Sequence, residues 1–395
     1  MADWLSADEA LSRLRVRPQT LYAYVSRGRL RAEPDPAEPR RSRYRASDVV
    51  ALAERKARGR KAADVARGAI AWGEPVLTSA ITTVRDGRLY YRGQDALRLA
   101  ETATLEEVAR LLRGGAGLPP DEPLLAPPGP GAAARAFAAF AARAASDRPA
   151  QGRPAEALAD EAAGLLDLMA AAAAGPEGAG LREEEAAAIH ERLARAWRAP
   201  RDGWDAIRRA LVLLADHELN ASTFAARIAA STGASLSAAV LAGLAALSGP
   251  RHGGMAARVE AFAAAAARGD WRKAARGATP PGFGHPLYPD GDPRAAALLD
   301  AIEAPPALAA LRADVEAATG ERANMDFALT ALRQSLNLPA EAPFALFAVA
   351  RTAGWLAHAI EQVETGALIR PRARYVGQTP SALAEDGKAP LTASR

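Results

Sequence analysis

Apolar side chains recur along most of the chain at the three- and four-residue spacing of a helix that buries one face. The clearest run begins after residue 220 and is interrupted at Gly233, which predicts two consecutive helices. Its apolar positions are Phe224, Ile228, Leu236, Val240 and Leu244. Alanine-rich stretches at 132–145 and 155–174 predict two more helices, because alanine is the strongest helix former. Since few segments alternate as strands do, we expect an all-α fold.

One short hairpin interrupts this helical pattern. The segments 76–82 and 88–91 flank Asp86-Gly87, a dipeptide typical of two-residue hairpin turns. Further along, Thr104 precedes an apolar-periodic run, and we expect it to be the N-cap of a helix.

The first 54 residues predict two short helices, a basic loop and a third helix. The segment 6–9 (Ser-Ala-Asp-Glu) is a capping box that opens the first helix. Pro18 suits the first position of the second helix, which we expect to end at Gly28. The segment 30–44 is rich in proline and arginine, and Ser47 starts the third helix. This order predicts a winged helix-turn-helix.

Composition narrows the class of protein. A length of 395 residues suggests two or three domains. The absence of cysteine excludes disulfides and thiolate chemistry and favours a cytoplasmic location. We expect no membrane segment and no signal peptide, because no long apolar run is free of charges. Residues 1–60 hold 14 Arg and Lys against 8 Asp and Glu, a net charge of +6, so the basic character belongs to the N-terminal part.

Three of the five histidines lie close together in the sequence. His217 precedes the paired helices, while His252 and His285 each stand in a turn framed by glycine or proline. Such turns fix unusual backbone conformations and let a ligand approach closely. Because each turn also has an arginine nearby, the pattern indicates a binding or catalytic site. His190 and His358 lie on helical runs, and we expect both to be ordinary helix side chains, His358 a packed one.

The N-terminal segment resembles the DNA-binding domain of the MerR family and of excisionase-like proteins. The similarity is carried by 18–24 (Pro-Gln-Thr-Leu-Tyr-Ala-Tyr), 28–30 (Gly-Arg-Leu) and 43–44 (Arg-Tyr). The resemblance implies that the second helix enters the major groove of DNA and that 40–45 forms a wing on phosphate. The implied contact residues are Gln19, Thr20, Tyr22, Arg27 and Arg43. The alternative is a helical extension with solvated arginines, since such folds also bind proteins.

From about residue 71 to residue 377 the chain resembles a citrate synthase, and seven stretches carry the similarity in the order that the family has them. They are 91–93 (Tyr-Arg-Gly), 215–224 (Ala-Asp-His-Glu-Leu-Asn-Ala-Ser-Thr-Phe), 249–254 (Gly-Pro-Arg-His-Gly-Gly), 282–285 (Gly-Phe-Gly-His) with 292–294 (Asp-Pro-Arg), 324–327 (Asn-Met-Asp-Phe), 347–355 (Phe-Ala-Val-Ala-Arg-Thr-Ala-Gly-Trp) and 370–372 (Arg-Pro-Arg). The resemblance implies a Claisen condensation of acetyl-CoA with oxaloacetate to citrate and CoA. It implies no permanently bound cofactor and no metal.

The resemblance assigns three residues to the chemistry. A carboxylate alone is too weak a base for a thioester α-proton, so Asp326 would act together with a hydrogen bond from His252 to the enolate oxygen. His285 would polarise the ketone of oxaloacetate and protonate the alkoxide that forms.

The resemblance also assigns the groups that bind substrate. A dianionic keto acid calls for the planar, bidentate cations that arginine provides. The residues matched to its binding are His217, Arg294 and Arg351, and Arg370 would reach into the partner's site in a homodimer. Gly253 and Gly254 would leave room for the CoA arm. Between His285 and Asp292 the basic residues that commonly meet CoA phosphate are missing, and Arg251 or Arg372 would have to compensate.

The expected domains are 1–54 (winged helix-turn-helix), 55–70 (helical linker), 71–252 (first part of the large domain), 253–338 (small domain), 339–380 (return of the large domain) and 381–395 (C-terminal tail).

Two other functions stay open. Propionyl-CoA could replace acetyl-CoA, as in 2-methylcitrate synthase, because one methylene changes discrimination by only ~1–3 kcal/mol. Alternatively, the chain is a DNA-binding regulator that uses the synthase fold as a metabolite sensor, and DNA would then be a partner of residues 1–54.

Overall fold

The computed structural model describes residues 4–373 except 15, 27, 37, 40, 58–76, 116–126, 177–186, 276 and 372. The chain divides into two compact units, residues 1–78 with 372–395, and residues 79–371. Both units are mainly helical, and each also has a three-stranded sheet. The expected all-α fold is therefore confirmed for most of the described chain, but it did not include these two sheets. None of the described helices has the length and apolarity needed to cross a bilayer.

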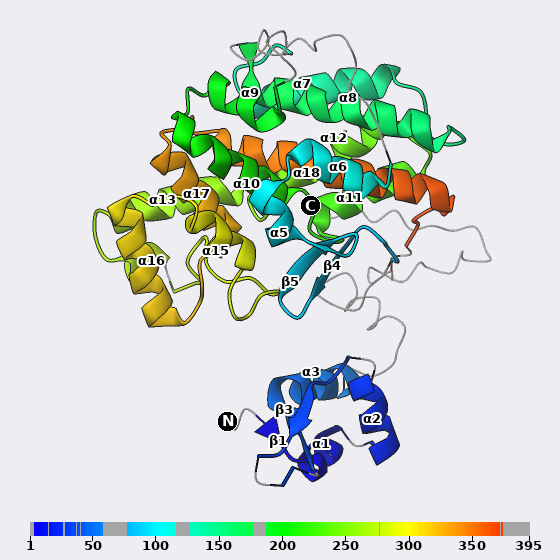
Figure 1. Ribbon diagram of the computed structural model, residues 1–395, viewed down its shortest axis with the longest axis vertical. Helices are drawn as coiled ribbons and strands as arrows, with labels where there is room; N and C mark the ends of the chain where they lie inside the picture. The colour runs from blue at the N-terminus through cyan, green and yellow to red at the C-terminus, as the bar shows by residue number, and fades with distance from the viewer. Residues whose placement is uncertain are drawn as a thin grey trace, which may run out of the picture. The chain divides into compact units, whose positions relative to one another are not determined.

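The first unit contains three helices and a small antiparallel sheet, and α1 and α3 pack against strand β3 (Figure 1). Its elements are β1 (Trp4–Leu5), α1 (Ala7–Leu14), α2 (Pro18–Ser26), β2 (Ala32–Pro34), β3 (Ser42–Arg45) and α3 (Ala46–Ala57). Strand β3 lies between β1 and β2, and Leu14, Leu21 and Tyr44 form part of the buried core. The predicted capping box is confirmed, because the Ser6 N–H donates to the Glu9 carboxylate at 2.8 Å and the Glu9 N–H donates to the Ser6 hydroxyl at 3.3 Å.

The second unit opens with a hairpin at the predicted turn, but its first strand spans Thr82–Arg85 and not 76–82, and the chain then continues as helices (Figure 1). Its strands are β4 (Thr82–Arg85), β5 (Arg88–Tyr91) and β6 (Gln94–Asp95). Its helices up to the site are α5 (Ala96–Thr102), α6 (Leu105–Arg113), α7 (Ala132–Ser146), α8 (Ala155–Ala174), α9 (Ile189–Ala196), the 3-10 turn η2 (Arg201–Gly203) and α10 (Trp204–Leu214). The later helices are α11 (Ala221–Ser231), α12 (Leu236–Leu247), α13 (Met255–Ala266), α14 (Trp271–Ala275), α15 (Pro293–Leu299), α16 (Pro306–Thr319), α17 (Met325–Ser335) and α18 (Ala342–Thr365).

Local signals in the sequence were reliable in this unit. The helix pairs predicted around 132–174 and after residue 220 are confirmed as α7 and α8, and as α11 and α12. Asp86 and Gly87, with φ of 51° and 73°, form the turn between β4 and β5. Thr104 caps α6 and completes a capping box with Glu107.

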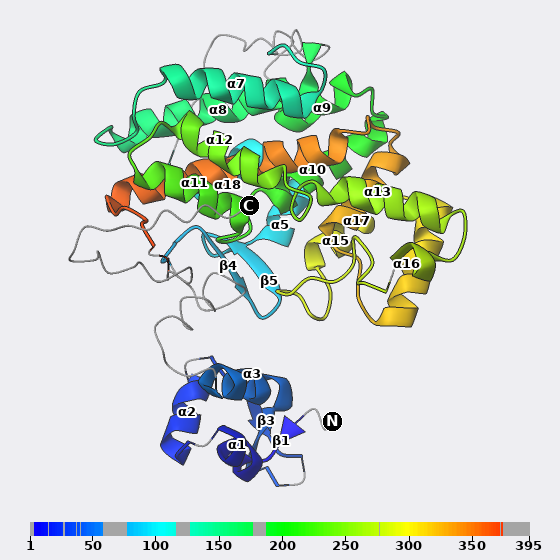
Figure 2. The ribbon, with the colours of Figure 1, turned by 180° about the vertical axis from the view of Figure 1, so that it is seen from behind.

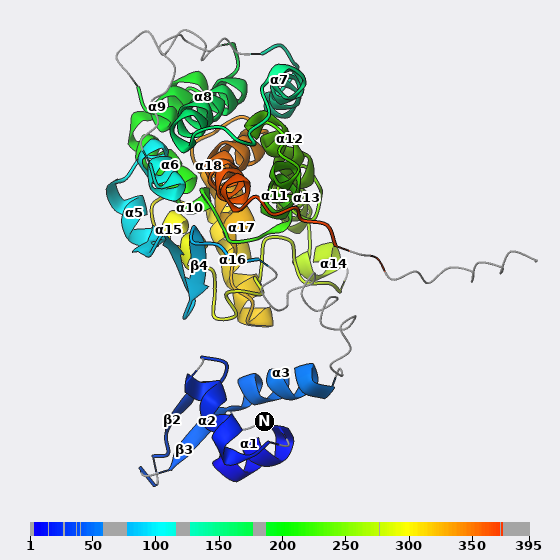
Figure 3. The same ribbon diagram turned by 90° about the vertical axis from the view of Figure 1, so that its right-hand side faces the viewer.

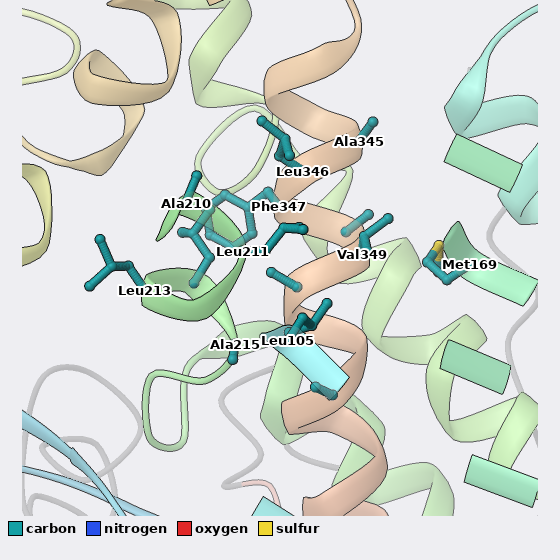
Figure 4. Close-up of a cluster of buried hydrophobic side chains, with 14 of the residues drawn as sticks. Leu105, Met169, Ala210, Leu211, Leu213, Ala215, Ala345, Leu346, Phe347 and Val349 are labelled. Carbon is teal, nitrogen blue, oxygen red and sulfur yellow. The ribbon is translucent and has the colours of Figure 1, made fainter. Parts of the chain in front are cut away.

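Helix α18 is the centre of the second unit, and most of its 24 residues are buried. Figure 3 shows it nearly end-on, with α6 and α10 on one side and α11 and α12 on the other. Figure 4 shows part of the surrounding core, where Leu346 and Val349 of α18 share one apolar cluster with Leu105, Met169 and Leu211 from α6, α8 and α10. Removing so much apolar surface from water fixes the position of α18.

Helices α13 to α17 form a group at one side of the second unit (Figures 1 and 2). Within the group, α17 packs against both α13 and α15. The loops that lead into α13, α15 and α17 contain His252, His285 and Asn324, and Arg294 and Asp326 follow in the first turns of α15 and α17. Most of the candidate site residues are therefore attached either to this group or to α18.

Candidate active site

Three chain segments bring the candidate histidines near one another. His217 lies between α10 and α11, His252 lies between α12 and α13, and His285 lies in the loop before α15. The rings of His217 and His285 pack edge to face, with their centroids 5.2 Å apart. The ring of His252 packs against Phe347 of α18 at 5.6 Å, and charge on His252 would act on His217. The sequence prediction that these three histidines share a site is consistent with this arrangement.

Arg294, in the first turn of α15, is 4% exposed and held by a carboxylate. Its Nε and Nη2 donate to the two carboxylate oxygens of Asp292 at 3.0 and 2.8 Å. Burial opposes the charge of Arg294, but the neighbouring Asp292 outweighs it and raises the arginine pKa. The guanidinium carbon lies 5.3 Å from the ring centroid of Tyr288. Arg294 is thus fixed in orientation and permanently charged.

Arg351, in the middle of α18, is buried. Its Nε donates to the carbonyl oxygen of Leu214 at 3.0 Å, and its guanidinium carbon lies 4.9 Å from the centroid of the Phe347 ring. Within the described part of the chain no carboxylate forms an ion pair with it. Burial consequently lowers the pKa of Arg351 to about 10. Because an unpaired buried charge is costly, an anionic ligand beside Arg351 would be strongly favoured.

The three imidazoles are uncharged at neutral pH. Burial, and then the charge of Arg351, lowers the pKa of His252 to about 4. Burial and the charge of Arg294 lower the pKa of His285 to about 4, and the same causes bring the pKa of His217 well below its usual range. The Leu287 N–H donates to Nδ1 of His285 at 3.2 Å, so neutral His285 carries its proton on Nε2. The N–H donor of neutral His285 is therefore at Nε2.

Ser222, in the first turn of α11, contacts His252. The Ser222 hydroxyl donates to Oδ1 of Asn220 at 2.7 Å, lies 2.8 Å from Nε2 of His252, and accepts a hydrogen bond from Nε1 of Trp355 at 3.2 Å. A serine hydroxyl has one proton, so the recipient of that proton decides the tautomer of His252. While Ser222 donates to Asn220, Nε2 of His252 is the donor to Ser222. If the serine proton turns to Nε2 instead, the imidazole proton is on Nδ1. The sequence reasoning missed this role, because Ser222 lies 30 residues from His252.

Asp326 lies in the first turn of α17, where its backbone N–H donates to the N-cap side chain of Asn324 at 3.0 Å. Its Oδ1 is buried and forms no hydrogen bond with any described residue. Burial raises the pKa of Asp326 to about 7, although the charge of Arg294 acts in the opposite direction. No hydrogen bond joins Asp326 to His252 in the described chain. Asp326 is linked to the other candidate residues through Arg294, whose charge acts on its carboxyl group.

Gly253 and Gly254 belong to a tight turn that follows His252. The His252 and Gly254 N–H groups both donate to the carbonyl oxygen of Gly249, at 3.0 and 3.2 Å. A Cβ at Gly253 would meet the Leu247 side chain at 2.7 Å, and a Cβ at Gly254 would meet the same Gly249 oxygen at 2.9 Å. Packing within the turn alone is therefore enough to require both glycines. If Gly253 and Gly254 also leave room for a ligand, that role comes in addition to their role in packing.

Tyr288 also belongs to the cluster, although the sequence analysis did not single it out. Its hydroxyl lies 2.9 Å from Nε2 of His217, and its ring lies 5.0 Å from that of His285. Burial raises the pKa of Tyr288 to about 12, so the phenol keeps its proton. The signal that could have revealed it is its position three residues after His285 in the same short loop.

The other predicted residues lie elsewhere. Arg370 is exposed near the end of the described chain and takes no part in this cluster. In the first unit, Gln19 and Tyr22 are exposed on α2 and Thr20 is half-buried. Arg27 and Arg40 lie outside the described residues. Arg43 donates from Nε to Glu33 at 2.7 Å.

The described residues form no group of three His, Asp or Glu side chains suited to a metal ion. They do combine two buried guanidinium groups, three neutral imidazoles and a carboxyl group that titrates near neutrality. Such a set can bind a small carboxylate dianion, polarise a carbonyl group and accept a proton from carbon.

The sequence model of the family described as citrate synthase, C-terminal domain, matches residues 128–372, which is more than half of the chain. The citrate synthase of Haloferax volcanii is 39% identical over 186 residues, covering 43% of this chain and 49% of that protein. The 2-methylcitrate synthase 1 of Corynebacterium glutamicum is 34% identical over 186 residues, with the same coverage. The chain therefore spans about half the length of the curated relatives it matches.

Solved structures extend the similarity beyond this region. The citrate synthase of Thermotoga maritima superimposes with a TM-score of 0.62 and 25% identity, covering 78% of this chain and 94% of that one. The citrate synthase of Thermoplasma acidophilum, solved as a ternary complex with carboxymethyl coenzyme A and oxaloacetate, gives a TM-score of 0.61 and 26% identity. That alignment covers 80% of this chain and 96% of the other.

Proposed function

The chain belongs to the citrate synthase family, and on that premise we propose that it condenses acetyl-CoA with oxaloacetate, giving citrate and CoA. The observation that carries the proposal is the pair of buried guanidinium groups, Arg294 and Arg351, beside neutral imidazoles. Because Arg351 has no anion of its own among the described residues, it is suited to a carboxylate of the keto acid. His217 lies within reach of both arginine charges and would complete the pocket.

The protonation states support the proposed chemical steps. Asp326 would take the methyl proton of acetyl-CoA, since its pKa of about 7 suits a general base near neutral pH. His252 would donate a hydrogen bond to the enolate oxygen from Nδ1, which requires the Ser222 hydroxyl to turn its proton from Asn220 to Nε2 of His252. The enol carbon then attacks the ketone carbon, and Nε2–H of His285 supplies the proton for the alkoxide. Water finally cleaves the thioester to release CoA.

We infer that closure of two domains assembles this site. Residues 253–338 would form the small domain and 71–252 with 339–380 the large one, while 55–70 and 381–395 lie largely outside the described residues. The grouping of α13 to α17 supports this division (Figure 1). Closure would bring Asp326 of the small domain to the thioester and exclude water from the enol. The turn at Gly253 and Gly254 would then border the CoA arm.

We also propose a homodimer in which Arg370 completes the site of the partner subunit. The exposed position of Arg370 near the end of the described chain supports this role, because it leaves the side chain free to reach another molecule. Arg372, the other candidate for binding CoA phosphate, lies outside the described residues, and Arg251 is exposed beside His252.

Release of free thiol tests the condensation directly. Purified protein mixed with oxaloacetate and acetyl-CoA should release CoA, and omission of oxaloacetate should abolish the release. The match to both citrate and 2-methylcitrate synthases makes propionyl-CoA the second thioester to test. A higher kcat/KM with propionyl-CoA would replace the acetyl assignment, and no release with either thioester would remove the enzymatic proposal.

For the first unit we propose a winged helix-turn-helix that binds double-stranded DNA, with α2 in the major groove and β2–β3 as the wing. Tyr22 is 64% exposed on α2, which supports a contact surface there. Arg43 is a poorer phosphate ligand than the sequence suggested, because Glu33 accepts from its Nε and its guanidinium carbon lies 5.3 Å from the ring centroid of Trp4. The contacts would therefore fall mainly to α2, with Gln19 and Thr20.

Binding of the full-length protein to genomic DNA fragments at several salt concentrations tests this second function. Phosphate contacts release counterions, so the affinity should fall steeply with salt, and Tyr22→Ala should weaken binding. Retained fragments together with an absence of thiol release would favour a regulator that senses a metabolite. A flat salt dependence without retained fragments would remove the DNA partner.

A further inference from the structure

One face of α18 holds the segment that leads into His217. Arg351, Gly354 and His358 lie on successive turns of that face, because residues three and four apart align on a helix. Arg351 Nε donates to the Leu214 carbonyl oxygen at 3.0 Å, and the Gly354 N–H donates to the Ala215 carbonyl oxygen at 3.1 Å. One residue further, the Asp216 carboxylate lies 3.2 Å from Nε2 of His358. Three consecutive residues are thus attached to three consecutive turns.

The hydrogen bonds of His358 define its tautomer. Nη1 of Arg227 lies 3.1 Å from Nδ1 of His358, and a guanidinium can only donate. Nδ1 must therefore be unprotonated, and the imidazole proton is on Nε2, where it is donated to Asp216. All three residues are at most 1% exposed, so water has little access to either hydrogen bond. His358 is therefore more than the packed histidine that its apolar helix predicts.

Arg227 is itself held in place from two sides. Its Nε donates to Gln362 at 2.9 Å and its Nη1 donates to the Glu361 carboxylate at 2.6 Å. Glu361 also accepts from the backbone N–H of Ala80 at 2.8 Å. The orientation of His358 is consequently fixed by a chain of hydrogen bonds that ends on backbone, and it leaves Asp216 little freedom to move.

We propose that His358 is a positioning residue for the keto acid: by holding Asp216 it aligns the 214–217 segment, and with it Arg351 and His217, before the substrate arrives. The Leu214 carbonyl that orients Arg351 and the backbone of His217 both belong to that segment. Pre-alignment of these groups lowers the cost of ordering them when the dianion binds. The inference rests on the proposed condensation, because it concerns the binding of oxaloacetate.

Two substitutions separate positioning from simple packing without changing the charge of the site. His358→Phe keeps a buried planar ring and removes both hydrogen bonds. His358→Gln has one acceptor and one donor in its amide and can keep the bonds to Arg227 and Asp216. We expect His358→Phe to raise the KM for oxaloacetate and its Kd by about tenfold, with a smaller change in kcat, and His358→Gln to stay within about threefold of the wild type.

The measurements are steady-state kinetics with oxaloacetate varied and calorimetric titration of the full-length protein with oxaloacetate alone. His190→Phe, the same exchange on α9, serves as the control and should leave both constants unchanged. An unchanged KM and Kd in His358→Phe, or equal effects of Phe and Gln, would overturn the positioning role. If the wild-type protein neither binds oxaloacetate nor releases thiol, the proposed function itself fails, which is a different result.

Discussion

At the scale of single residues, burial separates the pKa values of the candidate groups. Burial raises the pKa of Asp326 to about 7, and burial with neighbouring arginine charge lowers that of His252 to about 4. Near neutral pH the carboxyl group can therefore exchange a proton while the imidazole stays neutral. Environments that shift two titratable groups in opposite directions are how one site supplies both a base and a hydrogen-bond donor.

The pH dependence of the reaction should follow Asp326. A general base must be ionised, and its folded-state pKa is raised to about 7, so the ionised fraction grows as the pH rises through that value. We expect kcat/KM for acetyl-CoA to fall about tenfold per pH unit below pH 6 and to level off above pH 8. A profile that is flat from pH 5 to pH 8, measured by thiol release, would contradict the assignment.

In the absence of substrate, the carboxyl group of Asp326 should lower the free energy of unfolding as the pH rises. Its ordinary pKa of 3.8 applies to the unfolded chain, so between pH 4 and pH 7 unfolding releases a proton that the folded state retains, and stability falls as the pH rises. Asp326→Asn should therefore increase the free energy of unfolding by up to about 4 kcal/mol at pH 8 and by almost nothing at pH 4, while thiol release drops at least 100-fold. Urea denaturation at the two pH values measures the difference.

The Ser222 hydroxyl should affect kcat because it influences the tautomer of His252. Ser222→Ala removes the hydroxyl 2.8 Å from Nε2 and leaves the imidazole free to place its proton on either nitrogen. We expect kcat to fall about 10- to 100-fold and the KM for oxaloacetate to change little. Thr232→Ala, which removes a hydroxyl beyond the end of α11, is a suitable control and should keep full activity. Equal kcat in wild type and Ser222→Ala would contradict this role.

At the scale of elements, the sequence predicted what depends on neighbours along the chain. Apolar periodicity located α11 and α12, and the dipeptide Asp86-Gly87 located the β4–β5 turn. The contacts of Ser222, Tyr288 and His358 could not be predicted in this way, because each joins segments that only tertiary folding brings together. The candidate site was therefore predicted as a set of residues, without its hydrogen bonds.

Gly354 illustrates how tertiary packing outweighs helix propensity. Within a helix, Gly→Ala ordinarily stabilises by about 1 kcal/mol. Here a Cβ would lie 2.3 Å from Oδ1 of Asp216 and 2.6 Å from the Ala215 carbonyl oxygen. We expect Gly354→Ala to lower the free energy of unfolding by about 1–3 kcal/mol. Gly269→Ala, where nothing lies within 4 Å of the new Cβ, should change it by less than about 0.5 kcal/mol. Urea denaturation of both variants is the measurement.

At the scale of the whole molecule, charge and fold are distributed unevenly. The net positive charge belongs to the first 60 positions, whereas the residues of the proposed reaction all belong to the second unit. The sequence alone predicted this division, because a net charge is a sum over residues. It could not predict that Arg31, Arg41 and Arg43 form ion pairs with carboxylates of their own unit. Such pairing leaves less charge available to DNA phosphate than the net charge suggests.

The proposed homodimer predicts that two inactive variants restore part of the activity when they pair in one dimer. Arg370→Ala and Asp326→Asn should each be nearly inactive alone, because every site would lack one group. Co-expressed, half of the randomly paired dimers contain one chain of each kind, and in these one site has both Asp326 and the partner's Arg370. Thiol release should then return to about a quarter of the wild-type value. If Arg370 served its own subunit, or acted only as surface charge, the mixed dimers would gain nothing over the separate variants.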